Sequence, residues 1–137
     1  MNTNDSADLK PMTVDQLVQY FVDTAIAEEE AILEATTDEK DPTFPAAVKR
    51  MQALYMEMER IDRELRKRGR KARLALMPLY DHPNAQVNLQ AAHYTLGVAP
   101  VVARERLQVI ADSGWAPQFW QARSIISALD SGNFKPD

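Results

Sequence analysis

The chain has 137 residues, a length that suits one domain and is short for two. Apolar residues make up 45% and charged residues 26%, as in an ordinary globular protein. Cysteine is absent, which excludes disulfides, thiolate metal sites and cysteine nucleophiles. The four glycines are too few for a glycine-rich phosphate loop or for a β-fold with many turns, and the net charge of −4 indicates no particular partner.

The N-terminal stretch is polar and acidic and lacks the basic-then-apolar order of a secretory signal. No segment approaches the roughly 20 consecutive apolar residues that a membrane helix needs. We therefore expect a cytoplasmic protein with no membrane association. A disordered acidic tail is expected over residues 1–12, followed by a single helical domain over residues 13–137.

Two long helices are expected first, as an antiparallel hairpin. Thr13 and Gln16 form a capping-box pattern, which predicts a helix over about residues 14–35. A second helix is expected from residue 44 or 45 to residue 68, where Gly69 can adopt the left-handed conformation that ends helices. The expected core-facing side chains, at 100° per residue, are Val14, Leu17, Val18, Phe21, Val22, Ala25, Ile32 and Leu33, then Ala47, Val48, Met51, Leu54, Tyr55, Met58 and Leu65. The methionines of the second helix either fill this core, which we favour, or form an adaptable binding groove.

Shorter helices are expected in the second half of the chain, at about residues 70–80, 85–96, 100–113 and 117–130. Pro78 should kink the first of them, because its ring displaces the carbonyl group four residues earlier. The helices over residues 85–96 and 100–113 carry apolar side chains on opposite sides, as helices packed between two neighbours do. No segment alternates with a period of two, so no strand is expected and the fold class is all-α with six helices.

Residues 70–96 align with residues 103–129 at an offset of 33, which is typical of stacked helix pairs in an α-solenoid. The run from Leu74 to Val87, with Pro78, the turn after Tyr80, and the later Ala91-Ala92, resembles a HEAT repeat. Asn88 stands where that family usually has arginine. The resemblance implies a long N-terminal helical hairpin followed by two short HEAT-like helix pairs, an α–α superhelix.

The chain as a whole resembles a family of short bacterial HEAT-like proteins over about residues 14–136. The resemblance rests on the leading hairpin, the central repeat, and the two segments Ser113–Gln118 and Leu129–Pro136. It implies a fold and the capacity to bind other macromolecules across a groove. It supplies no catalytic residues.

Catalytic motifs are scarce. His82 lies in a turn and His93 on a helix, and they share no spacing typical of metal ligands. The acidic cluster Glu28, Glu29, Glu30 and Glu34 fits a solvated helix face better than a pair of acid–base groups. We therefore expect no enzyme activity, no catalytic residues, no cofactor and no metal site.

Trp120 carries the strongest sign of a binding surface. It lies about 100° around its helix from Phe119 and roughly opposite Ala122, beside Arg123, and Trp and Arg are typical anchors of protein interfaces. The facing helix offers Gln90, His93 and Tyr94, so we predict a partner-binding site of Gln90, His93, Tyr94, Trp120 and Arg123. The alternative is that the C-terminal segment, with Phe134, folds back over Trp120. Trp115 is expected in the core.

Charge is distributed unevenly along the chain. Residues 1–41 hold eleven acids and two bases, whereas residues 49–73 hold ten bases and four acids. These segments either neutralise each other, which we favour, or the basic run binds anions through Arg66, Lys67, Arg70 and Lys71.

The favoured function is a non-enzymatic protein-binding module, such as an adaptor or a toxin-neutralising immunity protein. The alternative is nucleic-acid binding through the basic stretch 63–73.

Overall fold

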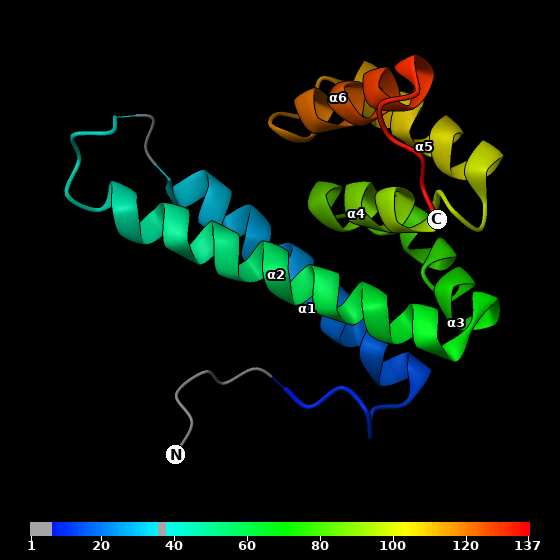
Figure 1. The fold of residues 1–137 in the computed structure, drawn as a ribbon. Helices are drawn as coiled ribbons and strands as arrows, with labels where there is room; N and C mark the ends of the chain where they lie inside the picture. Colours follow the sequence, from blue (N-terminus) through cyan, green and yellow to red (C-terminus); the bar gives the residue numbers. More distant parts are fainter. Residues whose placement is uncertain (1–6, 36–37) are drawn as a thin grey trace. The chain divides into compact units, whose positions relative to one another are not determined.

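The computed structural model describes residues 7–35 and 38–137. It divides the chain into two compact units, the first ending at Arg68 and the second beginning at Gly69. Within the described residues there are six α-helices, a 3₁₀ helix and no strand, which confirms the all-α prediction (Figure 1). No helix in this part of the chain combines the length and the apolar character that crossing a bilayer requires.

The first unit contains two long antiparallel helices, α1 (Val14–Glu34) and α2 (Phe44–Arg68), which lie side by side (Figure 1). The predicted capping box forms. The amide of Gln16 donates to the Thr13 hydroxyl at 3.1 Å, and the amide of Thr13 donates to the Gln16 side-chain oxygen at 2.9 Å. The fully buried apolar side chains are Leu17, Phe21, Ala25, Met58, Ile61 and Leu65.

The buried face of this hairpin is narrower than the sequence pattern predicts. Leu33 and Tyr55, both expected in the core, are 68% and 54% exposed. Two paired helices cover one side of each other, so side chains at the edge of a broad apolar stripe remain in solvent. Glu28 and Asp62 are buried, and Asp62 accepts a hydrogen bond from Arg66 at 2.8 Å.

The segment before α1 lies along the C-terminal half of α2. Leu9 is buried, and Arg60 donates to the main-chain oxygen of Ala7. Arg68 donates to the main-chain oxygens of Leu9 at 3.0 Å, Lys10 at 3.1 Å, and Met12. Residues 7–12 of the expected disordered tail are thus attached to α2, and residues 1–6 of that tail lie outside the described residues.

The second unit is arranged around α4 (Ala85–Thr95), which contacts α5 (Pro100–Ser113) and α6 (Gln118–Ser131). Before α4 come the short helix α3 (Arg70–Leu74) and the 3₁₀ helix η1 (Met77–Asp81). The sequence predicted one kinked helix over residues 70–80. The structure instead ends α3 at Leu74, the residue whose carbonyl group the ring of Pro78 would meet in a continuous α-helix.

Helix α4 is buried on opposite sides, as expected for a helix between neighbours. Val87 and Leu89 are both inaccessible to solvent. Helix α5 does not follow the same expectation, because Val102 and Val109 are 45% and 50% exposed. Its buried side, with Leu107, packs towards α4 and α6.

Buried amide side chains connect the elements of the second unit. Asn88 on α4 donates to the main-chain oxygens of Tyr80 at 2.6 Å and His82 at 3.2 Å. Gln118 on α6 donates to the side-chain oxygen of Gln86 on α4 at 3.0 Å. The amide nitrogens of Asn88 and Gln118 thereby find acceptors on other segments, whereas the buried side-chain oxygen of Asn88 has no hydrogen-bond partner among the described residues. Leaving a buried amide nitrogen unpaired is costly, so these bonds favour one packing of the elements. Asn88 therefore holds the turn after η1 against α4.

Candidate functional site

Two exposed tryptophans, Trp115 and Trp120, and the half-buried Phe119 lie within six residues of one another at the start of α6. We call Trp115, Phe119, Trp120 and Arg123 the aromatic patch. Trp120 is 63% exposed, although it is the largest side chain of the helix. Its ring centroid lies 4.4 Å from that of Phe119, and the two rings are tilted by 35°.

Arg123 completes this patch one turn further along α6. Its guanidinium carbon lies 4.9 Å from the Phe119 ring centroid and 5.8 Å from the Trp120 ring centroid. A guanidinium group at this range is attracted to the negative face of an aromatic ring. The three side chains therefore restrict one another, and Trp120 and Arg123 remain accessible to a partner.

Local geometry explains why Trp120 faces outward. Ala122 of the same helix is fully buried, and a residue two positions away on an α-helix points to a different side. Trp115 lies in the preceding turn, where its main-chain oxygen accepts a hydrogen bond from the amide of Phe119 at 2.7 Å. Trp115 was expected in the core and is instead 46% exposed, so both tryptophans of the chain are accessible.

The residues predicted on α4 do not form an exposed surface with this patch. Gln90 and Tyr94 are buried, at 4% and 6% exposure. His93 is half-buried and lies between two rings, 4.7 Å from Tyr94 and 5.9 Å from Phe134. The physical reason is that η1, α5 and α6 all pack on α4, which leaves little of its surface in solvent.

The C-terminal segment, residues 133–137, follows a different path from the alternative that the sequence allowed. The amide of Phe134 donates to the main-chain oxygen of Ala128, and the Phe134 ring packs edge-on against His93. Further on, Arg73 donates to the main-chain oxygen of Asp137 at 2.8 Å. The segment thus runs from α6 towards α4 and α3 and leaves Trp120 exposed (Figure 1).

The predicted anion-binding residues are divided between the two units. Arg66 forms an ion pair with Asp62, whereas Lys67 is exposed on the same unit. Arg70 and Lys71 are exposed on α3 of the second unit. The acidic N-terminal third supplies part of the neutralisation that we favoured, through the ion pair between Glu34 and Arg50 at 2.9 Å.

A basic recess that the sequence did not reveal lies in the first unit, between the N-terminal segment and α2. It encloses about 180 Å³, and its lining residues are Asp8, Leu9, Lys10, Arg60, Arg63, Glu64 and Lys67. The spacing of Arg63 and Lys67, one helical turn apart, was visible in the sequence. The position of Lys10 beside them could not be predicted from the sequence, because it depends on how the segment before α1 packs on α2.

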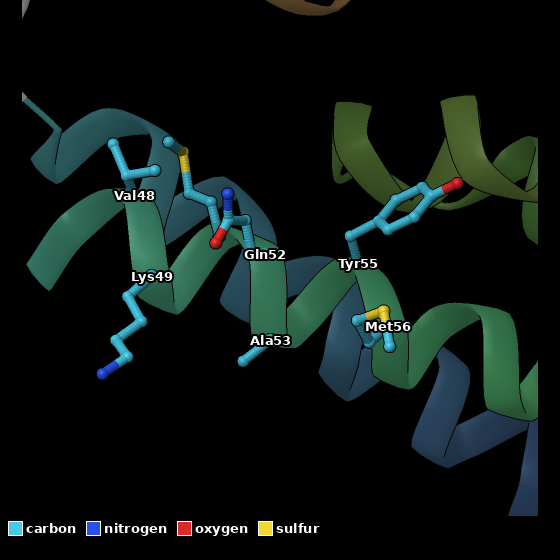
Figure 2. Close-up of a pocket in the computed structure, with 7 residues that line it drawn as sticks. Val48, Lys49, Gln52, Ala53, Tyr55 and Met56 are labelled. Atoms are coloured by element: carbon cyan, nitrogen blue, oxygen red, sulfur yellow. The ribbon is translucent and has the colours of Figure 1, made fainter. Parts of the chain in front are cut away.

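The outer face of α2 forms a shallow apolar groove of about 650 Å³ (Figure 2). Its lining residues are Val48, Lys49, Met51, Gln52, Ala53, Tyr55 and Met56. Met56 is 62% exposed, whereas Met58 is fully buried. The methionines of α2 therefore serve in part as core side chains and in part as the wall of this groove.

Two tyrosines with raised pKa values form hydrogen bonds within the protein. Burial, together with the hydrogen bond that its hydroxyl donates to Glu57, raises the pKa of Tyr20 to about 12. Burial also raises the pKa of Tyr80, whose hydroxyl is hydrogen-bonded to Thr95. Neither tyrosine belongs to the aromatic patch or to the basic recess.

The described residues contain no group of three or more His, Cys, Asp or Glu side chains placed to hold a metal ion.

The chain is similar to a known protein family and to a solved bacterial structure. A family model described as a domain of unknown function, DUF2019, matches residues 15–130. The crystal structure of the protein RPA1889 from Rhodopseudomonas palustris CGA009 has a TM-score of 0.82 and 38% sequence identity, over 96% of this chain and 99% of that chain. The search among curated proteins found no match.

Proposed function

The chain belongs to the DUF2019 family, and we propose that it is a non-enzymatic protein-binding module that uses the aromatic patch as its contact surface. The observation that carries this proposal is the exposure of Trp120 beside Phe119 and Arg123. Burying a large exposed indole ring against a partner would release a substantial hydrophobic free energy. Trp and Arg are also the residues that most often dominate interface energies.

Preorganisation adds to the suitability of the patch. The stacking of Arg123 on two rings restricts its side chain before any partner arrives, so less conformational entropy is lost on binding. The partner that fits offers an apolar pocket for the Trp120 ring and an acidic group for Arg123. Such a partner would also cover Trp115, which is exposed in the turn that precedes α6.

We place this module in the bacterial cytosol, as an adaptor or as an immunity protein that neutralises a toxin. The α4 arrangement supports a HEAT-like reading of the second unit, because α4 packs against η1 before it and against α5 and α6 after it. Asn88, which stands where a HEAT repeat usually has arginine, donates to the main chain of the turn that precedes α4. Stacked helix pairs of this kind present surfaces to other macromolecules.

The proposal is tested by comparing capture of binding proteins from bacterial lysate by the wild-type chain, Trp120→Ala and Arg123→Ala. Val101→Ala is the matched control, since Val101 is 71% exposed on α5 outside the patch. A partner of the patch should lose about 2 kcal/mol or more of binding free energy with Trp120→Ala, with a smaller loss for Arg123→Ala. A partner that binds wild type and Trp120→Ala equally contradicts the proposed surface.

Nucleic-acid binding through residues 63–73 is the second candidate, supported by the exposure of Arg63, Lys67, Arg70 and Lys71. We rank it lower because other cations of the stretch are engaged within the protein. Arg68 forms an ion pair with Glu64 and binds main-chain oxygens, and Arg73 is buried and donates to Asp137. We expect no measurable affinity for duplex DNA at physiological salt, where non-specific binders reach a Kd of about 10⁻⁴–10⁻⁶ M.

A further inference from the structure

One wall of the basic recess is fixed by hydrogen bonds from Arg68. These bonds do not involve the side chains of Lys10, Arg63 or Lys67, which line the recess. Arg68 donates to three main-chain oxygens of the segment before α1, those of Leu9, Lys10 and Met12. Leu9 of this segment is buried and contributes to the lining of the recess. These contacts fix the main chain of Lys10 beside the last turns of α2. The main chain that forms this wall of the recess is therefore held in place by the fold.

Positive charge remains available inside this recess. Arg60 is balanced by its ion pair with Glu57 at 2.8 Å, and Glu64 is balanced by Arg68 at 3.0 Å. The side chains of Lys10, Arg63 and Lys67 form no ion pair with any residue that the structure describes. Asp8 is the remaining acid of the lining, and one of its oxygens already accepts the amide of Lys10 at 3.3 Å. The lining therefore carries an excess of positive charge, which favours an anion with more than one negative charge.

We propose that the recess binds a diphosphate group through Lys10, Arg63 and Lys67. The guanidinium group of Arg63 can donate two parallel hydrogen bonds to one phosphate, and the ammonium groups of Lys10 and Lys67 add two compact positive charges. Three cations from two segments line a recess of about 180 Å³, which suits a small, highly charged ligand. The site is independent of the aromatic patch, which belongs to the other unit.

An extended nucleic acid fits this recess less well. Asp8, the acid of the lining that no described cation balances, would repel a phosphate backbone that continued past the three cations. A diphosphate group is short and can lie within the volume of about 180 Å³ beside the three cations. Binding of duplex DNA is accordingly the competing outcome in the test.

The test is calorimetric titration of the full chain with inorganic pyrophosphate in a phosphate-free buffer at low salt. The variants are Lys10→Gln, Arg63→Gln and Lys67→Gln, and Lys49→Gln is the control, because Lys49 is exposed on α2 outside the recess. Each recess variant should weaken binding about tenfold, the usual value of one charge-assisted hydrogen bond. The control should bind as the wild type does.

Several results would overturn the proposal. One is the absence of saturable pyrophosphate binding by the wild-type chain at millimolar concentration. A second is an equal loss for Lys49→Gln and Lys67→Gln, which would show a diffuse charge effect. A third is duplex DNA binding that is tighter than pyrophosphate binding and weakened by the same variants. Thermal melts of each variant verify folding, and Lys67→Gln alone decides the case if another variant unfolds, because Lys67 is exposed and makes no ion pair with a described residue.

Discussion

The ring of Phe134 packs edge-on against His93, with 5.9 Å between the ring centroids. This contact decides between the two roles that the sequence left open for Trp120. The C-terminal segment lies on α4, where it covers part of His93, and the Trp120 side chain remains 63% exposed. Exposure of Trp120 is thus a property of the folded unit.

Removal of residues 133–137 should leave the environment of Trp120 unchanged. The experiment uses a Trp115→Phe background, so that the fluorescence reports Trp120 alone. Because Trp120 is already exposed, we expect the same emission maximum with and without the segment. A shift of the emission to longer wavelength after truncation would show that the segment covers Trp120 in solution.

Gly97→Ala should detach the C-terminal segment from the second unit. A Cβ atom at position 97 would overlap the main-chain carbonyl group of Asp137, which Arg73 binds. We expect the free energy of unfolding to fall by about 1 kcal/mol, measured by urea denaturation. In a chain that lacks residues 133–137 the same substitution should cost close to nothing, because the group it meets is gone. An equal cost in both chains contradicts this account.

Met58→Ala and Phe21→Ala should each lower the free energy of unfolding by about 2–5 kcal/mol, because both side chains are fully buried in the hairpin. Met56→Ala is the matched control, since Met56 is the same residue type on the same helix and is 62% exposed. The control should change stability by less than about 0.5 kcal/mol. Denaturant titration of the three variants checks the prediction, and similar costs for Met56 and Met58 would mean that the register of α2 is wrong.

Tyr20→Phe should reduce the loss of stability at high pH. Burial and the Glu57 contact raise the pKa of Tyr20 from 10 to about 12, so the folded state favours the protonated phenol. This stabilisation is complete below the unfolded pKa and is lost as the pH rises towards 12. Chemical denaturation between about pH 9 and pH 12 should show a shallower decline for the Phe variant than for wild type. Parallel curves for the two proteins would contradict the raised pKa.

Features that depend on neighbours in the sequence could be predicted. The capping box of Thr13 and Gln16 forms, because its two hydrogen bonds lie within one turn. The break near Pro78 could be anticipated for the same reason, although the sequence did not show that the chain would continue as a 3₁₀ helix. The all-α class followed from helical periodicity and from the absence of strand patterns. The outward direction of Trp120 followed from helix geometry.

Tertiary packing decided the rest of the candidate sites. The exposure of Gln90 and Tyr94 depends on how many helices pack on α4. The apolar periodicity of one helix does not indicate how many other helices will surround it. The basic recess brings Lys10 next to Arg63, more than fifty positions along the chain, through hydrogen bonds from Arg68 to main-chain oxygens. Main-chain acceptors are present at every residue, so no side-chain pattern marks such a contact beforehand. The sequence by itself determined the helices and their apolar faces, and only the folded chain determined which of those faces solvent can reach.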